Sequence, residues 1–197
     1  MSLDPEQLRV GAAYEAARGG ARAAAIELRR RRRVDLGDLI SLVFESRETL
    51  AAAAEEALRA ERIEAREWVR GEAGKFASLL PPEGGLAASL FVEVADAAEM
   101  ASVLSELDGI AGSIHLEIDG SSCRAAAASP GPVAEGAAPV AYLRFELTPS
   151  QREAWIEGAR VLLRAVHPRY SVSTELSDEQ RAAIATDLMP ASSGQRR

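Results

Sequence analysis

The stretch RRRRRVDLGDLISLVFESRETLAAAAEEALRAER, residues 29–62, decides the fold, because it joins a helix end, a strand and a long helix. The arginines at 29–33 are predicted to end a helix, where cations interact favourably with the helix dipole. The apolar residues 39–44 have the length and composition of a buried strand. Ser46 is then a predicted N-cap, and neither Gly nor Pro interrupts residues 49–66. A charged helix of about five turns is therefore expected after the strand.

Strand signals recur along the rest of the chain without a regular alternation with helices. Asp119-Gly120, for example, is a hairpin turn signal after the alternating apolar residues of 113–119. Further strands are expected at residues 86–94, 123–128, 140–147, 161–167 and 170–176. Helices are expected at 5–28, in two pieces separated by Gly19-Gly20, and after the capping residues Asp96, Thr148 and Ser177.

This pattern predicts an α+β fold with a mainly antiparallel sheet of about six strands, flanked by helices that include the long charged one. A chain of 197 residues, 47% of them hydrophobic, can bury one sizeable core. We expect a single α+β domain over residues 1–190. The Pro- and Gly-rich residues 129–139 are expected to form a flexible loop, and residues 191–197 a disordered tail.

Local patterns spread over nearly the whole chain share one resemblance. They include Tyr14-Glu15, Leu36-Gly37, Phe44-Glu45, Leu58-Arg59 and His167-Pro168-Arg169-Tyr170. Together they resemble the bacterial family called domain of unknown function 3501 (DUF3501). That family is uncharacterised, so the resemblance implies membership of a family but no particular activity. It also implies association with redox proteins such as rubrerythrins and iron–sulfur oxidoreductases, in a redox or oxidative-stress system.

Composition argues against several classes of function. The formal net charge of −7 argues against general nucleic-acid binding, which needs a net basic face. Cys123 is the sole cysteine, so neither an intrachain disulfide nor a multi-cysteine metal site can form. The charged residues near the N-terminus are unlike a signal peptide, and no uncharged apolar run has the length of a membrane span. We expect a cytoplasmic protein with no cofactor, no metal and no membrane contact.

Templates of known catalytic and metal sites are missing from the sequence. It contains no phosphate-binding loop, no Gly-x-Ser-x-Gly and no His-Glu-x-x-His. A zinc site is not expected with two histidines. His115 is predicted to be a solvated strand residue, and His167 to make a structural hydrogen bond. The arginines at 29–33 could bind an anionic ligand, RNA or an acidic partner, but a solvated helix end is favoured, since no aromatic residue stands beside them.

One polar constellation remains after these exclusions. Glu61 shares the direction of the apolar residues on the helix after Ser46, and is predicted to make a buried ion pair with Arg47 or with an arginine of 29–33. The alternative is that the helix breaks near Ile63, so that Glu61 reaches water. A narrow stripe is predicted to face solvent and comprises Glu48, Glu55, Arg59, Arg62 and Arg66. The candidate polar site comprises Glu45, Arg47, Glu56, Arg59, Glu61, Arg62, His167 and Tyr170.

Two functions remain open at this point. The favoured one is a binding or accessory protein that acts in a complex with a protein partner, because catalytic templates are missing and the charged helix suits a partner. The alternative is an enzyme with a Glu- and Arg-lined pocket for an anionic substrate. That pocket would require the convergence of Glu45, Arg47, Glu56 and Glu61 with His167 or Tyr170. Glu45 and Arg47 are expected to form the rim of the site, because they lie where the first strand meets the helix.

Overall fold

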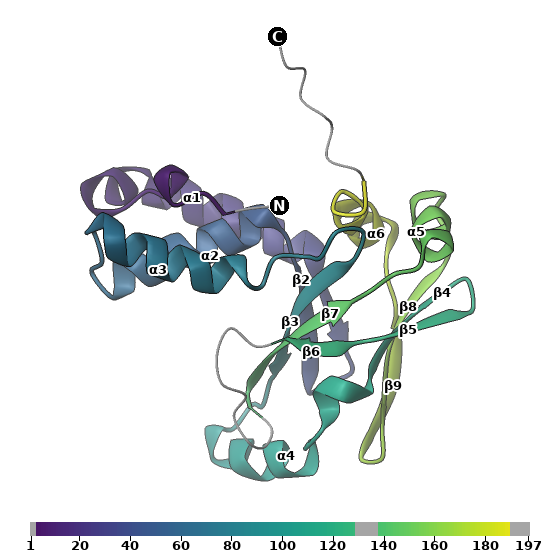
Figure 1. Ribbon diagram of the computed structural model, residues 1–197. Helices are drawn as coiled ribbons and strands as arrows, with labels where there is room; N and C mark the ends of the chain where they lie inside the picture. Colours follow the sequence, from purple (N-terminus) through teal and green to yellow (C-terminus); the bar gives the residue numbers. More distant parts are fainter. Residues whose placement is uncertain (1–2, 129–137, 190–197) are drawn as a thin grey trace.

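Two antiparallel sheets form a sandwich, and three helices project from it as an arm (Figure 1). The computed structural model of the chain describes residues 3–128 and 138–189. The five-stranded sheet has the order β1-β2-β3-β7-β6, and the four-stranded sheet the order β5-β4-β8-β9. The predicted α+β class is therefore confirmed, but the described residues form nine strands in two sheets instead of about six strands in one.

The five-stranded sheet begins with a hairpin of β1 (Arg33–Leu36) and β2 (Ile40–Glu45). The sequence pattern predicted β2 but not β1, because residues 35–38 carry turn signals. The turn lies at Gly37, whose φ of +69° suits glycine, and a Cβ there would collide with the hydroxyl of Tyr170. The remaining strands of this sheet are β3 (Leu86–Val92), β7 (Val140–Phe145) and β6 (Ala126–Ala128).

The four-stranded sheet packs its apolar side chains against the first. In β4 (Ile114–Ile118), burial alternates as predicted, and Asp119 and Gly120 take positive φ values of 47° and 78° in the hairpin turn to β5 (Ser121–Arg124). The expected strand at 123–128 is in fact divided between β5 and β6, which belong to different sheets. The other two strands are β8 (Val161–His167) and β9 (Tyr170–Glu175).

The first long helix is α1 (Gly11–Arg32), preceded by the 3-10 turn η1 (Pro5–Gln7). The expected division at Gly19 and Gly20 is wrong, because the helix continues through both glycines. Each glycine lowers helix propensity by about 1 kcal/mol but breaks no backbone hydrogen bond. As predicted, α1 ends within the arginine run, with four arginines in its last turn.

The long charged helix is two helices, α2 (Arg47–Ala60) and α3 (Arg66–Ala77). Ser46 caps α2 as predicted, with its side chain accepting a hydrogen bond from the backbone N–H of Thr49. The predicted continuation to residue 66 is wrong, because Arg62 takes a left-handed conformation, with φ of 56°. The backbone N–H of Ile63 then donates to the carbonyl of Leu58 at 2.8 Å, which completes a Schellman motif. The chain reverses there, at the tip of the arm.

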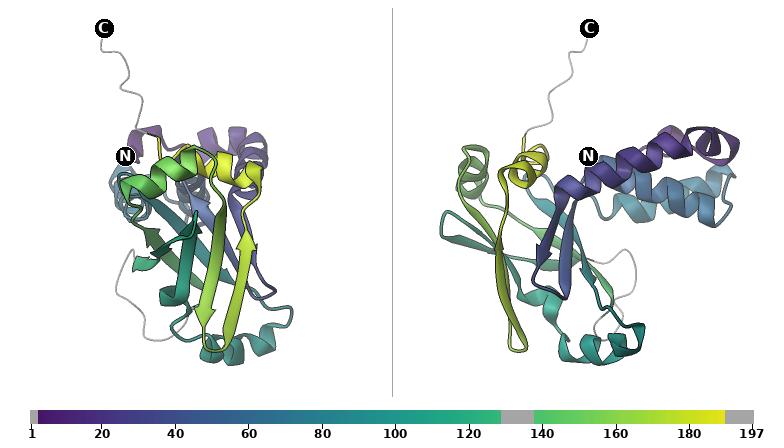
Figure 2. Two further views of the ribbon diagram at one scale, coloured as in Figure 1. Left: turned by 90° about the vertical axis from the view of Figure 1, so that its right-hand side faces the viewer. Right: turned by 180° about the vertical axis from the view of Figure 1, so that it is seen from behind.

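Shorter helices cover the ends of the sandwich (Figure 2). Thr148 and Ser177 form the expected capping boxes, which begin α5 (Pro149–Ile156) and α6 (Asp178–Ala185). Asp96 caps the 3-10 turn η2 (Ala97–Glu99), which leads into α4 (Met100–Glu106), and η3 (Ile110–Ser113) precedes β4. No helix among the residues described is long and apolar enough to span a membrane.

The sandwich and the arm have separate hydrophobic clusters. In the sandwich, the rings of Phe44 and Phe145 stack with centroids 6.1 Å apart. In the arm, Leu50 and Leu58 of α2 pack with Val69 of α3 and with the N-terminal residues 3 and 8. The expected tail at 191–197 lies outside the described residues, as does the expected loop at 129–139 except for its last two residues. The single domain over 1–190 stays a prediction.

Candidate functional site

A groove of about 1060 Å³ lies on the arm, bounded by α1, α2 and the N-terminal segment 3–9. Its walls come from residues 21–29 of α1 and 47–56 of α2. Alanine contributes much of its surface, through Ala21, Ala24, Ala25, Ala51, Ala52 and Ala53. Ile26, which also lines the groove, is 65% exposed. The groove is thus an open, mainly small-residue surface with a large apolar side chain at its edge.

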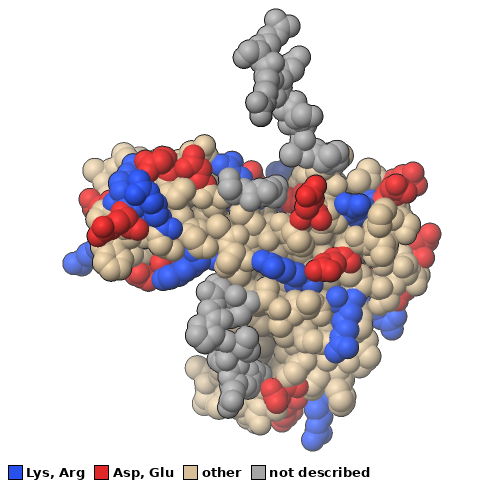
Figure 3. All heavy atoms as spheres, viewed as in Figure 1, with Lys and Arg blue, Asp and Glu red and all other residues tan. Residues whose placement is uncertain are grey.

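The charged residues of the groove come from its two helical walls and from the N-terminal segment, which contributes Asp4 and Arg9. The α1 wall contributes only arginines, Arg22 and Arg29. The α2 wall contributes the carboxylates of Glu48, Glu55 and Glu56 together with the guanidinium of Arg47, its first residue. Figure 3 shows acidic and basic side chains interspersed on the arm. The groove therefore has charged side chains along both helical walls, in addition to its alanines.

Glu55 is the buried carboxylate of this region, with a side chain only 6% exposed. It accepts hydrogen bonds from the backbone N–H of Arg9 at 2.9 Å, from Nε at 2.9 Å and from Nη2 at 2.7 Å. These bonds raise the pKa of Arg9, whose guanidinium also lies 5.8 Å from the ring centre of Tyr14. The prediction that Glu55 faces solvent is wrong, because the N-terminal segment covers that side of α2.

Glu56 joins the two walls of the groove. Its Oε1 accepts hydrogen bonds from the hydroxyl of Tyr14 at 2.9 Å and from Nε of Arg18 at 3.3 Å, and lies 3.6 Å from Nε of Arg22. Burial acts to raise the pKa of Glu56, but the bonds from Tyr14 and Arg18 outweigh it, so that the pKa is lowered. Burial, together with the bond to Glu56, raises the pKa of Tyr14. Glu56 is therefore held as an anion against α1.

The two residues expected at the rim of the site lie at different depths. Arg47 lines the groove, and its Nη2 donates to Gln7 at 2.5 Å. Glu45 is buried beneath it, at the end of β2, and does not line the groove. Its two carboxylate oxygens accept hydrogen bonds from the hydroxyls of Thr49 and Ser89, each at 2.5 Å. Glu45 thus ties α2 to the sheet, and only Arg47 is placed at a rim.

Three further candidate residues lie towards the tip of the arm. Arg59 donates to Glu15 of α1 at 2.6 Å, in an exposed ion pair. Glu61 and Arg62 are exposed in the turn between α2 and α3. The prediction of a buried ion pair at Glu61 is wrong, because the helix ends there and the carboxylate reaches water, as in the alternative. None of the three lines the groove.

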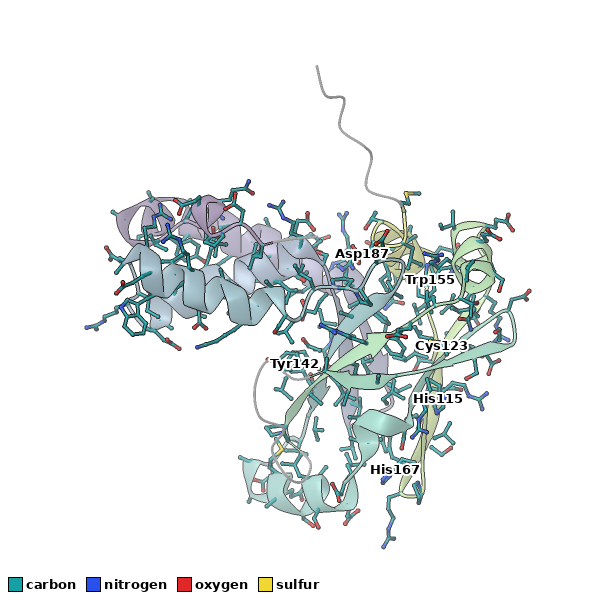
Figure 4. All side chains as sticks on the ribbon, in the orientation of Figure 1. His115, Cys123, Tyr142, Trp155, His167 and Asp187 are labelled. Atoms are coloured by element: carbon teal, nitrogen blue, oxygen red, sulfur yellow. The ribbon has the colours of Figure 1, made fainter. Side chains whose placement is uncertain are left out.

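His167 and Tyr170 belong to the sandwich, and Figure 4 shows His167 at the end remote from the arm. Nε2 of His167 lies 2.9 Å from the carbonyl of Asp108, in agreement with a structural role. The hydroxyl of Tyr170 donates to the carbonyl of Leu36 at 2.6 Å and accepts from the N–H of Leu39 at 3.1 Å. Tyr170 therefore fixes the hairpin turn between β1 and β2. Of the eight candidate residues, only Arg47 and Glu56 meet in the groove.

The arginine run is not the uniformly solvated helix end that was expected. Arg30 and Arg31 pair with Glu27 and Glu179 on the surface. Arg32 is only 2% exposed, and pairs with Asp187 while donating to the carbonyls of Phe44 and Ala183. Burial raises the pKa of Asp187, although the charge of Arg32 opposes that effect.

Arg33 donates to Glu93 at 2.8 Å. Its hydrogen bond is the main cause that lowers the pKa of Glu93. Arg29, in contrast, makes no hydrogen bond or ion pair with any described residue. Within the run, the groove therefore holds Arg29, the arginine with which no described residue forms a hydrogen bond or an ion pair.

A second hollow, of about 360 Å³, lies beside Cys123 at the junction of β5 and β6. The Sγ atom of Cys123 is 3.4 Å from the carbonyl of Glu146, and burial raises the pKa of the thiol. Such a thiol is a poor nucleophile and a poor metal ligand. Over residues 3–128 and 138–189, no group of three or more His, Cys, Asp or Glu side chains is arranged to hold a metal ion.

Sequence reasoning did not identify the residues that hold Glu55 and Glu56 in place. These are Arg9 of the N-terminal segment and Tyr14, Arg18 and Arg22 of α1, which contact Glu55 or Glu56 across 34 to 46 residues of chain. The alternation of Arg and Glu on α1 and α2 was visible, but nothing local indicated which pairs would meet. Ala51, Ala52 and Ala53 form part of the groove surface, and no motif in the sequence indicated that role.

Comparison with known proteins gives a family and a fold. A family model described as "Protein of unknown function (DUF3501)" matches residues 2–188. A crystal structure of a novel protein of unknown function from Burkholderia pseudomallei superimposes with a TM-score of 0.91 at 27% sequence identity. The match covers 96% of this chain and all of that one. No curated protein matches the chain significantly.

Proposed function

Because this chain belongs to the DUF3501 family of proteins of unknown function, we propose its role from its own geometry. It is an accessory protein that binds a helix of a partner protein in the groove between α1 and α2. A cytoplasmic setting, expected from the composition, and a partner from a redox or oxidative-stress system, implied by the family resemblance alone, form part of this proposal.

The surface of the groove carries the proposal. Alanine side chains allow the backbone of a second helix to approach closely, and helix-in-groove binding is a common mode of peptide recognition. The wall segments 21–29 and 47–56 are each about 13 Å long, which matches between two and three turns of a seated helix. Ile26 is 65% exposed at the edge of the groove, where it can pack on such a helix.

The enzyme alternative has less support from the arrangement of polar side chains. It required Glu45, Arg47, Glu56 and Glu61 to converge with His167 or Tyr170. In the structure, Glu45 is buried, Glu61 is at the tip of the arm, and both sandwich residues are remote from the groove. The two that do meet, Arg47 and Glu56, are engaged by Gln7 and by Tyr14 with Arg18. These contacts hold the groove together.

Photo-crosslinking in the native cells tests the proposal. A photoreactive amino acid replaces Ala24 on one wall or Ala52 on the other, and Ser173, which is exposed on the outer face of the sandwich, serves as the matched control. We expect one and the same protein to be captured from both walls but not from Ser173. The purified partner should then form a defined complex with the full chain, and Ala52→Trp, which fills the groove, should abolish that complex.

Two results would contradict the proposal. One is capture of the same proteins from all three positions, which would indicate random collision. The other is a purified partner that binds the Ala52→Trp variant as tightly as the unaltered chain. Circular dichroism of that variant controls for folding. If its helix content equals that of the unaltered chain, the arm is folded and the loss of binding is due to the filled groove.

A further inference from the structure

The two arginines on the α1 wall define a spacing that a bound helix must match. Arg22 and Arg29 are seven residues apart, which places them on the same side of α1 about 10.5 Å apart along its axis. The Arg22 side chain is 56% exposed, and Arg29 is exposed and has no partner among the described residues. The guanidinium of Arg29 is therefore open to a carboxylate from outside the chain, and that of Arg22, which already lies 3.6 Å from Glu56, keeps more than half of its side-chain surface exposed to a second one.

The opposite wall carries both signs of charge, because Arg47 stands beside the carboxylates of Glu48, Glu55 and Glu56. Glu48 is exposed at the N-terminal end of α2, where its partner is the hydroxyl of Ser46 at 2.9 Å. The charge of Glu55 is already matched by Arg9. A helix in the groove consequently meets arginines along the α1 edge and a mixed edge, with Glu48 and Arg47, along α2, so that acidic side chains of such a helix are favoured on the side that faces α1.

We infer that the occupant of the groove is a helix with two acidic side chains seven residues apart on the edge that faces α1, and small apolar residues on the face between the walls. This inference rests on the proposed function and adds the chemistry of the partner. A second copy of this chain fits less well if it seats its own α1 in the groove, because that helix carries Arg22 and Arg29 to a wall that already holds the same two arginines.

Designed peptides test the inference before the partner is known. The probe is a stapled, fluorescently labelled, alanine-rich helix of about 15 residues, since shorter unstapled helices are marginal in water. It carries two glutamates seven residues apart, and matched peptides carry glutamine or lysine at these positions. Binding to the full chain is followed by fluorescence anisotropy at about 50 and about 300 mM salt, because charge pairs at a rim are screened.

The expected order of affinity is glutamate, then glutamine, then lysine. The double variant Arg22→Glu, Arg29→Glu should weaken the glutamate peptide about tenfold and should bind the lysine peptide best. The matched control Arg62→Glu, Arg169→Glu makes an equal change in net charge at two exposed arginines outside the groove, and should leave the order unchanged.

Three results would overturn the inference. They are equal binding of the three peptides, no binding of any of them, and a loss of affinity that is as large in the control variant as in the groove variant. If the photoreactive groups at positions 24 and 52 crosslink two copies of this chain, the occupant of the groove is a second copy and not an acidic helix of another protein. If a partner is captured from both walls but the peptides show no charge preference, the proposed function survives and the acidic helix does not. If no partner is captured from the walls, the proposed function fails whatever the peptides do.

Discussion

Replacement of Glu55 by alanine should destabilise the protein much more than replacement of Glu61 by alanine. Glu55 lies within α2, and Glu61 is the residue that caps its C-terminal end. Glu55 is 6% exposed and accepts three hydrogen bonds from Arg9, two of them from the guanidinium. Glu61 is exposed in the turn that ends α2. The comparison therefore separates a carboxylate that joins the N-terminal segment to the arm from one that is solvated.

The size of the difference follows from what each substitution leaves behind. Removal of one member of a fully buried ion pair costs about 3 to 5 kcal/mol, because the other charge remains buried. Arg9 is 45% exposed and can return to water, so we reduce the expected cost of Glu55→Ala to about 2 kcal/mol. Glu61→Ala should cost at most about 0.5 kcal/mol, as is usual for a surface substitution.

Urea denaturation followed by circular dichroism measures both variants. With a dependence on urea of about 2 kcal/mol per M, Glu55→Ala should lower the midpoint by about 1 M and Glu61→Ala by a quarter of that or less. Glu55→Gln keeps the shape and an acceptor but not the charge, and should fall between the unaltered chain and Glu55→Ala. Equal midpoints for Glu55→Ala and Glu61→Ala would refute the role assigned to the Arg9 contact.

Three further predictions concern the sandwich. Asp187→Ala should lower the free energy of unfolding, measured by urea denaturation, by about 3 kcal/mol. Arg32 is 2% exposed, and without Asp187 its buried charge has only backbone carbonyls as partners. A loss below about 1 kcal/mol would contradict this reasoning. Since burial raises the pKa of Cys123, its reaction with a disulfide reagent at pH 8 should be at least about tenfold slower in the folded chain than in urea, and equal rates would show an accessible thiol. Burial and then Arg124 lower the pKa of His115, so its NMR titration midpoint should lie below 6.5 and rise in Arg124→Gln. Because this pKa is lower in the folded state, the stability that His115 contributes is present above pH 6.5 and is lost as pH falls through the folded pKa; a midpoint unaffected by Arg124→Gln would contradict the assigned cause.

The predictable parts of the fold are those with local causes. Ser46, Thr148 and Ser177 cap helices because a side-chain oxygen meets a backbone N–H only three residues away. The alternation of β4 and the turn at Asp119 were equally visible, since both depend on neighbouring residues. The break after α2 was expected near Ile63 only as the alternative, because the left-handed residue is Arg62 and not a glycine that would have marked the position.

The candidate site was predictable only in fragments. The sequence pattern predicted Arg47 and Glu56 as site residues, and both line the groove. Glu55 and Glu61 exchanged roles, because helical periodicity gives the relative directions of side chains but not which direction another segment covers. The N-terminal segment covers Glu55, and its contact with α2 joins residues 46 positions apart.

The sequence by itself determined the α+β class, the caps, the hairpin turn and the end of α1 in a run of arginines. These follow from hydrogen bonds, charges and periodicities that act over a few residues. Only the tertiary structure decided that β5 and β6 belong to different sheets, that Arg32 is buried against α6, and that α1, α2 and residues 3–9 enclose a groove. Each of these depends on contacts between distant segments, whose choice of partner is set by the packing of the whole chain and is not encoded in any one stretch of it.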